Sequence, residues 1–305
     1  IKTVCEISSL CGMAAPKALA LATGNNGAVL GVEQGILDET NRDRAVIVKT
    51  FVTTELQTAV AAHFGVDVVN TLTGFKYIGA KLRKYENAIP GDLRADYRRL
   101  PDAETRDLRL KHSRFFVFGG EESYGYLGAD FLRDKDANGA VVMFAELAAY
   151  AASRGLTVAG LLDEVYCETG YFLEVNKSKF FEGAAGAAKI AKLADSYGAN
   201  PPTQVDGCVV ARVRDFRKPG IVDEEGEPVS TEKMLFVDLA DGRSFAVRPS
   251  GTEPKIKYYM FARKAPAEGT RLSSEELAAA KTSVRASLDS MWSWLEKDIE
   301  SRLME

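Results

Sequence analysis

Short apolar runs alternate with helix-like stretches over the first half of the chain. Three runs rich in β-branched and aromatic residues, typical of buried strands, lie at residues 45–51, 66–71 and 114–118. The apolar spacing of amphipathic helices is found at residues 54–64, 75–85, 140–153 and 158–166. This alternation predicts a mainly parallel βαβ sheet covered by helices. The polar stretch 86–110 has few periodic apolar positions, so we expect an excursion between a helix and a strand there.

Beyond about residue 168 the pattern becomes rich in strands. Strand-like runs lie at residues 170–175, 208–213, 234–239, 245–248 and 255–263, and helical spacing at residues 184–197 and the C-terminus. The C-terminal helix is the clearest element, because Ser273 and Glu276 form a capping box before it. One apolar stripe then follows through Val284, Leu288, Met291, Trp292, Leu295, Ile299 and Leu303. Trp292 and Trp294 are expected to pack in a core.

These patterns predict an α/β chain of two domains. A mainly parallel βαβ domain is expected over residues 23–167, followed by a smaller α+β domain with a C-terminal helix over residues 168–305. Residues 1–22 are expected to be a remnant of a preceding domain. The length of 305 residues is sufficient for two sizeable cores.

Composition and charge exclude several classes of protein. Hydrophobic residues make up 46% and charged residues 27%, as in soluble globular proteins. No apolar run approaches the ~20 residues that cross a bilayer, so we expect no membrane partner. The formal net charge of −4, without a basic block, argues against a nucleic-acid partner. Affinity for anions must therefore come from a local site.

Cysteine and histidine usage favours a cytoplasmic protein without a metal site. The four cysteines lack C-x-x-C spacing and are typical of reduced thiols: Cys5, Cys11, Cys167 and Cys208. His63 and His112 are expected to be structural or surface residues, so histidine-based catalysis is not expected. The chain begins with Ile1 and no signal peptide follows, which is expected of a processed form or an excised piece.

The stretch Arg248-Pro249-Ser250-Gly251-Thr252-Glu253-Pro254 lies between two strand-like runs. A turn here would gather an arginine, two hydroxyls and several backbone N–H groups, a set that suits a phosphate. Gly251 is expected to allow a backbone conformation that other residues resist, and the prolines limit how the loop can flex. An ordinary hairpin turn with an exposed arginine is the alternative.

A second candidate loop follows the strand at residues 114–118. Ligands of open α/β sheets bind beyond the carboxyl ends of the strands, where Glu121 and Ser123 would lie. A carboxylate accepts hydrogen bonds from two neighbouring hydroxyls, and a serine hydroxyl donates or accepts. A solvated acidic turn is the alternative. Asp134 and Asp136 have the spacing of cation ligands, but a charged turn is the favoured interpretation, and no metal site is predicted.

Three motifs stand in order along the chain: Thr71-Leu72-Thr73-Gly74-Phe75-Lys76, Gly120-Glu121-Glu122-Ser123-Tyr124-Gly125 and the arginine loop at residues 248–254. Their order and spacing resemble the α-D-phosphohexomutase family, especially its phosphoglucomutase/phosphomannomutase branch, from about residue 20 to the end. Residues 23–28 are similar to the segment that leads into that family's third domain.

The resemblance implies roles for individual residues. Glu121 and Ser123 match the loop of the family's third domain that reads sugar hydroxyls. Lys135 matches a lysine that follows this loop in relatives. In the fourth domain, the loop that grips the phosphate that is not being transferred is matched by Arg248, Ser250, Gly251 and Thr252.

The chain departs from the family where the chemistry is carried out. The family's first domain supplies a phosphoserine in a T-A-S-H-N-P type segment, and its second supplies a D-x-D-x-D-R magnesium loop. Neither sequence occurs here. Because phosphoryl transfer needs in-line positioning and a charge-stabilising cation, the resemblance implies no catalytic residue and no metal ligand in this chain. Mg²⁺ would belong to the missing N-terminal domains of a parent phosphoprotein.

The expected function is therefore the recognition half of an intramolecular phosphotransferase of carbohydrate metabolism. The parent would interconvert hexose 1-phosphate and hexose 6-phosphate through a 1,6-bisphosphate, with glucose 1,6-bisphosphate as intermediate or activator, and this chain alone would be inactive. A phosphosugar-binding module without turnover, a phosphopentomutase-type relative and an unrelated α/β protein are the alternatives. The Glu121-Glu122 doublet with Ser123 favours glucose-type members, while mannose and pentose phosphates stay open.

Overall fold

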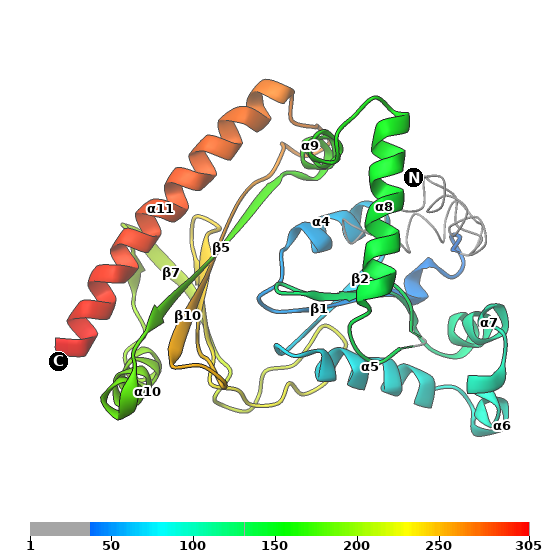
Figure 1. Ribbon diagram of the computed structural model, residues 1–305, viewed down its shortest axis with the longest axis horizontal. Coiled ribbons are helices and arrows are strands. Elements are labelled where there is room, and N and C mark those ends of the chain that lie inside the picture. The colour runs from blue at the N-terminus through cyan, green and yellow to red at the C-terminus, as the bar shows by residue number, and fades with distance from the viewer. Residues whose placement is uncertain (1–36, 131, 305) are drawn as a thin grey trace. The chain divides into compact units, whose positions relative to one another are not determined.

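The structure is a computed structural model that describes residues 37–130 and 132–304 (Figure 1). It divides into two compact units, each with its own core. Unit 1 contains the chain up to Val165 together with Asp223–Glu225, and unit 2 contains Tyr166–Val222 and the chain from Gly226 onward. The predicted N-terminal remnant, the segment at residues 23–28, Cys5 and Cys11 all lie outside the described residues.

Unit 1 is built on a four-stranded sheet in the order β2-β1-β3-β4. Its strands are β1 (Ala45–Thr50), β2 (Asp67–Thr71), β3 (Phe115–Glu121) and β4 (Gly125–Leu127). Central β1 pairs parallel with β2 and with β3, while β4 returns antiparallel to β3. The carboxyl ends of the three parallel strands therefore meet at one edge, where the chain leaves Thr50, Thr71 and Glu121. The predicted mainly parallel βαβ sheet is confirmed.

Helices cover both faces of this sheet. The helices whose residues share its core clusters are α4 (Leu56–His63), α5 (Phe75–Asn87) and α8 (Ala137–Ser153), and α9 (Val158–Thr169) packs against α8. Successive side chains of β1 alternate between the faces: Val46 and Val48 pack in one core cluster with α5, and Ala45 and Ile47 in another with residues of α4 and α8. No single helix in the described part of the chain is long and apolar enough to cross a membrane; only α8 and α9 taken together, bent by 84°, reach that length and composition.

The polar stretch 86–110 contains more regular structure than its pattern predicts. It holds α6 (Gly91–Arg94), the 3-10 turn η2 (Tyr97–Arg99) and most of α7 (Asp102–His112); another 3-10 turn, η1 (Arg42–Arg44), precedes β1. Periodicity misses α7 because two of its buried positions are polar, Thr105 and Arg109. Arg109 forms an ion pair with Asp130, which allows its charge to be buried.

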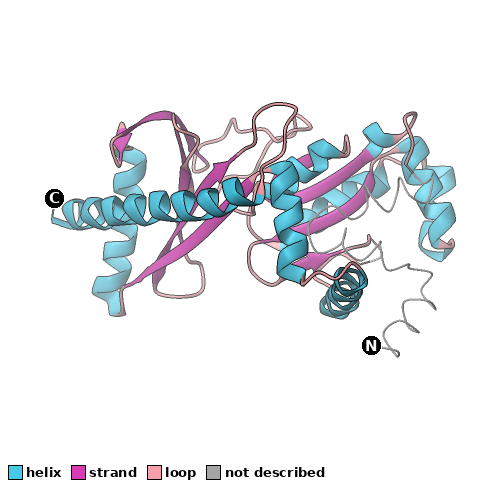
Figure 2. Ribbon diagram, turned by 90° about the horizontal axis from the view of Figure 1, so that it is seen from above, coloured by secondary structure: helices cyan, strands magenta, loops and turns pink. Residues whose placement is uncertain are grey.

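Unit 2 is a six-stranded antiparallel sheet with two helices. The strand order β5-β10-β9-β8-β7-β6 places β10 and β9 near the middle. The strands are β5 (Tyr171–Phe180), β6 (Gln204–Val205), β7 (Cys208–Asp215), β8 (Leu235–Leu239), β9 (Ser244–Pro249) and β10 (Lys255–Lys264). Residues of α10 (Gly183–Ala199) and α11 (Ser274–Met304) share one core cluster with the sheet. Figure 2 shows α11 as the long C-terminal helix of the predicted α+β architecture, which is confirmed.

The capping box and apolar stripe of α11 form as predicted. The backbone N–H of Ser273 donates to Glu276 Oε2 at 2.8 Å, and the N–H of Glu276 donates to Ser273 Oγ at 3.2 Å. The aliphatic and methionine positions of the stripe from Val284 to Ile299 are buried. Trp292 and Trp294 are partly buried and pack against the same core, which confirms their expected packing role.

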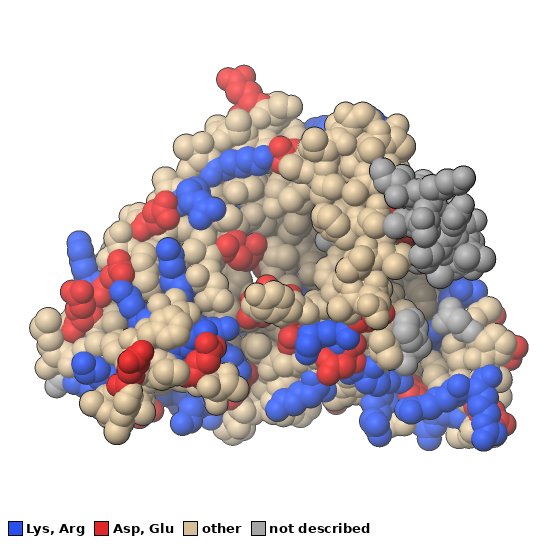
Figure 3. Space-filling model, in the orientation of Figure 1, with Lys and Arg blue, Asp and Glu red and all other residues tan. Residues whose placement is uncertain are grey.

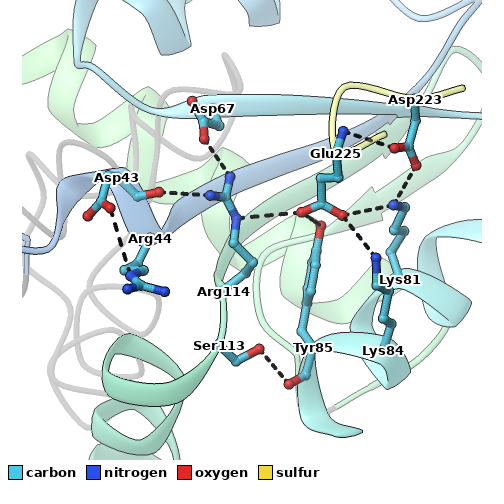
Figure 4. Close-up of polar contacts among 10 residues, drawn as sticks. All are labelled: Asp43, Arg44, Asp67, Lys81, Lys84, Tyr85, Ser113, Arg114, Asp223 and Glu225. Atoms are coloured by element: carbon cyan, nitrogen blue, oxygen red, sulfur yellow. Dashed lines mark hydrogen bonds and ion pairs between the residues drawn. The ribbon is translucent and has the colours of Figure 1, made fainter. Parts of the chain in front are cut away.

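Unit 1 includes three acidic residues from a distant part of the sequence, Asp223, Glu224 and Glu225. Lys81 Nζ of α5 lies 2.5 Å from Asp223 Oδ2 and 2.8 Å from Glu225 Oε2 (Figure 4). Tyr85 donates its hydroxyl to Glu225 Oε1 at 3.0 Å. Burial alone would lower the pKa of Lys81, but the hydrogen bonds with Asp223 and Glu225 outweigh burial and raise it. The segment is thus held by charge-assisted hydrogen bonds.

The Lys81→Met variant is expected to destabilise unit 1 by roughly 3 kcal/mol, because a buried carboxylate loses its cation. The Asp223 side chain is only 4% exposed. Hydrogen exchange of the α5 backbone amides, followed by mass spectrometry, measures this loss of stability. Since the pKa of Lys81 is raised in the folded chain, this stabilisation persists through neutral pH and disappears only as the pH rises through that alkaline pKa.

Lys84→Met is the matched control on the same helix. The Lys84 side chain is 45% exposed and lies 3.8 Å from Glu225 Oε2, so the loss should stay below about 1 kcal/mol. Equal losses in the two variants would contradict the role given to Lys81.

Candidate functional site

Charged side chains of both signs lie on the surface of the described chain. On the face shown in Figure 3, lysine and arginine side chains are interspersed with aspartate and glutamate side chains. The formal net charge is −4. Affinity for an anionic ligand therefore depends on the local geometry of the loops that the sequence singles out.

The loop after β3 is a tight hairpin at the carboxyl edge of the unit 1 sheet. Glu121 pairs with Gly125 across the β3–β4 ladder, which leaves Glu122, Ser123 and Tyr124 as a three-residue loop. A Cβ at Gly125 would lie 2.5 Å from Glu121 Cβ, so this crossing requires glycine. Ser123 and Tyr124 are exposed. The hairpin therefore presents Ser123 and Tyr124 to solvent beside the strand ends, while Glu122 is half-buried.

Glu121 is held by the neighbouring motif at residues 71–76. Its Oε1 accepts a hydrogen bond of 2.6 Å from the backbone N–H of Gly74, the residue before α5. Burial raises the pKa of Glu121, while this hydrogen bond and the positive charge of Lys135 act in the opposite direction. The structure thus joins two of the three sequence motifs and fixes the orientation of the carboxylate that the sequence assigns to sugar recognition.

Lys135 lies at the same edge as Glu121. Its Nζ is 2.9 Å from Asp134 Oδ1 and 5.2 Å from the centroid of the Phe75 ring, which begins α5. Asp136 caps α8, because its Oδ1 accepts from the N–H of Gly139 at 2.9 Å. Asp134 and Asp136 therefore have structural partners. Within residues 37–130 and 132–304, no group of three or more His, Cys, Asp or Glu residues is arranged to hold a metal ion.

Lys49 is a buried cation at this edge that the sequence analysis did not single out. It lies in β1 with a fully buried side chain, and its Nζ donates to Glu55 Oε1 at 2.9 Å and to the carbonyl of Thr53 at 3.3 Å. Thr53 Oγ1 in turn donates to the carbonyl of Gly120 at 3.5 Å, directly before Glu121. The sequence feature that could have revealed Lys49 is a lysine near the end of a mainly apolar strand. A charge buried there must be paired, which predicts a nearby carboxylate.

The arginine loop is the turn of the β9–β10 hairpin in unit 2. Pro249 pairs with Ile256, and the N–H of Ser250 donates to the carbonyl of Lys255 at 2.9 Å. Ser250 Oγ accepts from the N–H groups of Thr252 at 3.4 Å and Glu253 at 3.3 Å. The Ser250 hydroxyl thus closes the loop as an acceptor of two backbone hydrogen bonds, as in other serine turns, and its own hydrogen can still be donated.

Gly251 does not have the special backbone conformation expected from the sequence. It is absent from the described residues with positive φ, and a Cβ at this position would meet no atom within 4 Å. That expectation is wrong, because the proline-flanked turn closes without a left-handed residue here. The glycine instead leaves open space beside the Ser250 hydroxyl.

Arg248 is oriented by a carboxylate at the base of this loop. Its Nε donates to Glu232 Oε1 at 2.5 Å, and both side chains are mostly buried. Burial would lower the pKa of Arg248, but the charge and hydrogen bond of Glu232 outweigh it and raise that pKa. Glu232 and Pro249 also line a groove of about 480 Å³, together with Arg217 and residues of α10. Sequence reasoning missed Glu232, which precedes Arg248 by a full β-strand.

The predicted site residues therefore form two groups. Unit 1 brings Glu121 and Lys135 to one edge with Ser123 in the same hairpin as Glu121. Unit 2 places Arg248 and Ser250–Thr252 in one hairpin turn. Each group combines a charged side chain held by a neighbour with short hydroxyl or backbone donors.

Family models and individual relatives both point to the same protein family. Residues 24–168 match the family model of phosphoglucomutase/phosphomannomutase, alpha/beta/alpha domain III, and residues 181–280 match the C-terminal domain of the same family. The phosphoglucomutase of Staphylococcus haemolyticus is 31% identical over 230 residues, covering 74% of this chain and 37% of the relative. That of Staphylococcus epidermidis is 30% identical over 219 residues, covering 70% of this chain and 36% of the relative.

A solved structure with a similar chain path is the pp63/parafusin phosphoglucomutase of Paramecium in its open form. It shares 16% identity with a TM-score of 0.48, over 90% of this chain and 41% of that one.

The present chain spans well under half the length of the curated relatives it matches. The resemblance drawn from the three motifs is confirmed, and the chain belongs to the phosphoglucomutase/phosphomannomutase family, of which it carries domain III and the C-terminal domain.

Proposed function

We propose that this chain is the sugar- and phosphate-recognition part of a phosphohexomutase. The parent enzyme would interconvert hexose 1-phosphate and hexose 6-phosphate through a 1,6-bisphosphate. The observation that carries the proposal is that each unit holds one charged side chain ready for a ligand: Glu121 through the Gly74 N–H, and Arg248 through Glu232. The names of the curated relatives support a glucose phosphate as the substrate class.

The unit 1 edge suits a sugar. The Glu121 carboxylate is fixed by one hydrogen bond and can accept further hydrogen bonds from vicinal hydroxyls, while Ser123 can donate or accept beside it. Lys135, close enough to influence the charge of Glu121, adds a cation that a phosphosugar would meet. Orientation by the fold reduces the entropy lost when the ligand binds.

The unit 2 turn suits the phosphate that is not being transferred. Arg248 supplies a guanidinium already oriented by Glu232, and the loop adds the Ser250 and Thr252 hydroxyls. Charge-assisted hydrogen bonds to phosphate are stronger than neutral ones. The open space at Gly251 would let phosphate oxygens approach the backbone closely.

The chemical step would depend on groups that the family carries in its first two domains. The sequence contains no serine followed by His-Asn-Pro and no D-x-D-x-D run. The described residues do not form a metal site either, so they do not fit the family's Mg²⁺ and no step is assigned to it here. The proposal is therefore that this chain binds hexose phosphates without turning them over alone.

The Arg248→Ala variant tests the phosphate site. Loss of the charge-assisted hydrogen bonds should weaken binding of glucose 1,6-bisphosphate by ~1.5–3 kcal/mol, measured by isothermal titration calorimetry. Arg263→Ala is the matched control, since Arg263 is an exposed arginine on the adjacent strand β10. Unchanged affinity in Arg248→Ala would remove this arginine from the site.

The Glu121→Gln variant tests the sugar site. The amide oxygen can still accept from the Gly74 N–H, but the charge that binds hydroxyls is lost, so affinity for glucose 1-phosphate should fall about tenfold. Affinity for inorganic phosphate should not change. Glu122→Gln, at the next position of the loop, is the control. Equal losses for both ligands would show that Glu121 does not read the sugar.

The raised pKa of Glu121 predicts how ligand affinity and heat stability depend on pH. Glucose 1-phosphate affinity of the wild-type chain, corrected for inorganic phosphate, should decline on acidification at a higher pH than the ordinary 4.5 of a glutamate. Because the folded-state pKa is raised, the contribution of Glu121 to stability is fully present below its ordinary pKa and is lost as the pH rises through the folded-state pKa. Glu121→Gln should therefore be no less heat-stable than the wild type at pH 7. A clear loss of stability would contradict this assignment.

A further inference from the structure

Tyr124 has a backbone conformation that its residue type disfavours. Its φ is 58°, in the left-handed region, at the last position of the three-residue loop that joins β3 to β4. Hairpins with three-residue loops commonly need a left-handed residue there, and glycine is the usual choice. In an L-residue this conformation brings Cβ close to the following carbonyl oxygen, so a tyrosine at this position is strained.

Only one other non-glycine residue in the described part of the chain has a positive φ, and its surroundings explain it. Asp206, with φ of 48°, is of a type that tolerates this region. Its carboxylate also binds Arg243 Nη1 at 2.6 Å and Ser290 Oγ at 2.8 Å. Tyr124 has neither the residue type nor such contacts.

The side chain of Tyr124 is fully exposed, at 100%. Among the described residues no hydrogen bond or ring contact involves it. Tyr126, two positions later in the same hairpin, differs because its ring packs edge-to-face on Phe118, with 4.9 Å between the ring centroids. The strain at Tyr124 is therefore not offset by packing within the described structure, and uncompensated strain of this kind is concentrated at functional sites.

The position of the ring indicates a ligand. Tyr124 follows Ser123 directly and lies in the hairpin whose first strand ends at Glu121. Ser123 and Glu121 are the residues that we propose bind the sugar hydroxyls. A hexose has polar hydroxyls at its rim and C–H groups on its faces, and an aromatic ring offers a flat apolar surface for such a face. Tyrosine also has few rotatable bonds, so little conformational entropy is lost when its side chain is ordered on binding.

We propose that Tyr124 is a specificity-determining residue that stacks its ring on the C–H face of the hexose. The inference rests on the proposed function of the same loop, and it adds an apolar contact to the polar ones of Glu121 and Ser123. The strained backbone keeps the ring at the exposed tip of the loop, where a residue with negative φ would redirect the chain.

The test uses Tyr124→Gly, Tyr124→Phe and Tyr124→Ala in the full 305-residue chain. Glycine relieves the strain, so Tyr124→Gly should raise the thermal midpoint while weakening glucose 1-phosphate binding roughly five- to tenfold, the size of one aromatic contact. Binding of inorganic phosphate should stay unchanged. Tyr124→Phe keeps the ring and should bind like the wild type, whereas Tyr124→Ala should bind as weakly as Tyr124→Gly.

A purely structural role would change stability without separating the two ligands. Unchanged glucose 1-phosphate affinity in Tyr124→Gly, while Glu121→Gln still weakens it, would overturn the inference and leave the proposed function intact. Equal loss for glucose 1-phosphate and inorganic phosphate would also overturn it. If the wild-type chain binds no glucose 1-phosphate, both the inference and the proposed function fail.

Discussion

Parallel strands leave their carboxyl ends at the same edge of a sheet, and in unit 1 three strands do so. Central β1 pairs with β2 on one side and β3 on the other. This brings Lys49 at the end of β1, Gly74 in the turn after β2 and Glu121 at the end of β3 to one edge. The hydrogen bond from Gly74 to Glu121 exists only because of this register. Every feature that we assign to sugar recognition depends on it.

Unit 2 reaches a comparable result with antiparallel strands. The β9–β10 turn gathers backbone donors and the Ser250 hydroxyl, and the preceding connection to β8 supplies Glu232 to hold Arg248. In both units a charged side chain is oriented by a hydrogen bond within the fold before any ligand arrives. Preorganisation of this kind lowers the entropy cost of binding.

The sequence predicted the elements well where apolar periodicity carries the signal, as in β1, β3 and the stripe of α11. It failed for α7, whose buried positions include Thr105 and Arg109, because polar residues leave no apolar period. It also could not place Asp223 and Glu225 beside Lys81, since more than a hundred positions separate them and only tertiary folding joins them.

The candidate site shows the same division. The loops around Glu121 and Arg248 could be found because their residue types suit sugars and phosphates and because their order resembles a family. Their supporting residues could not: Lys49 is one lysine in an apolar run, and Glu232 meets Arg248 only through strand register. Gly251 shows the opposite error, since a glycine in a turn suggested a backbone need that is absent.

The central claim is that this chain recognises a phosphosugar but does not transform it. Calorimetric titration of the 305-residue chain with glucose 1,6-bisphosphate and magnesium, with product formation followed in parallel, tests this most directly. We expect saturable binding and no formation of a glucose monophosphate. Turnover would show that a phosphoryl acceptor lies within this chain and would contradict the claim, as would the absence of binding.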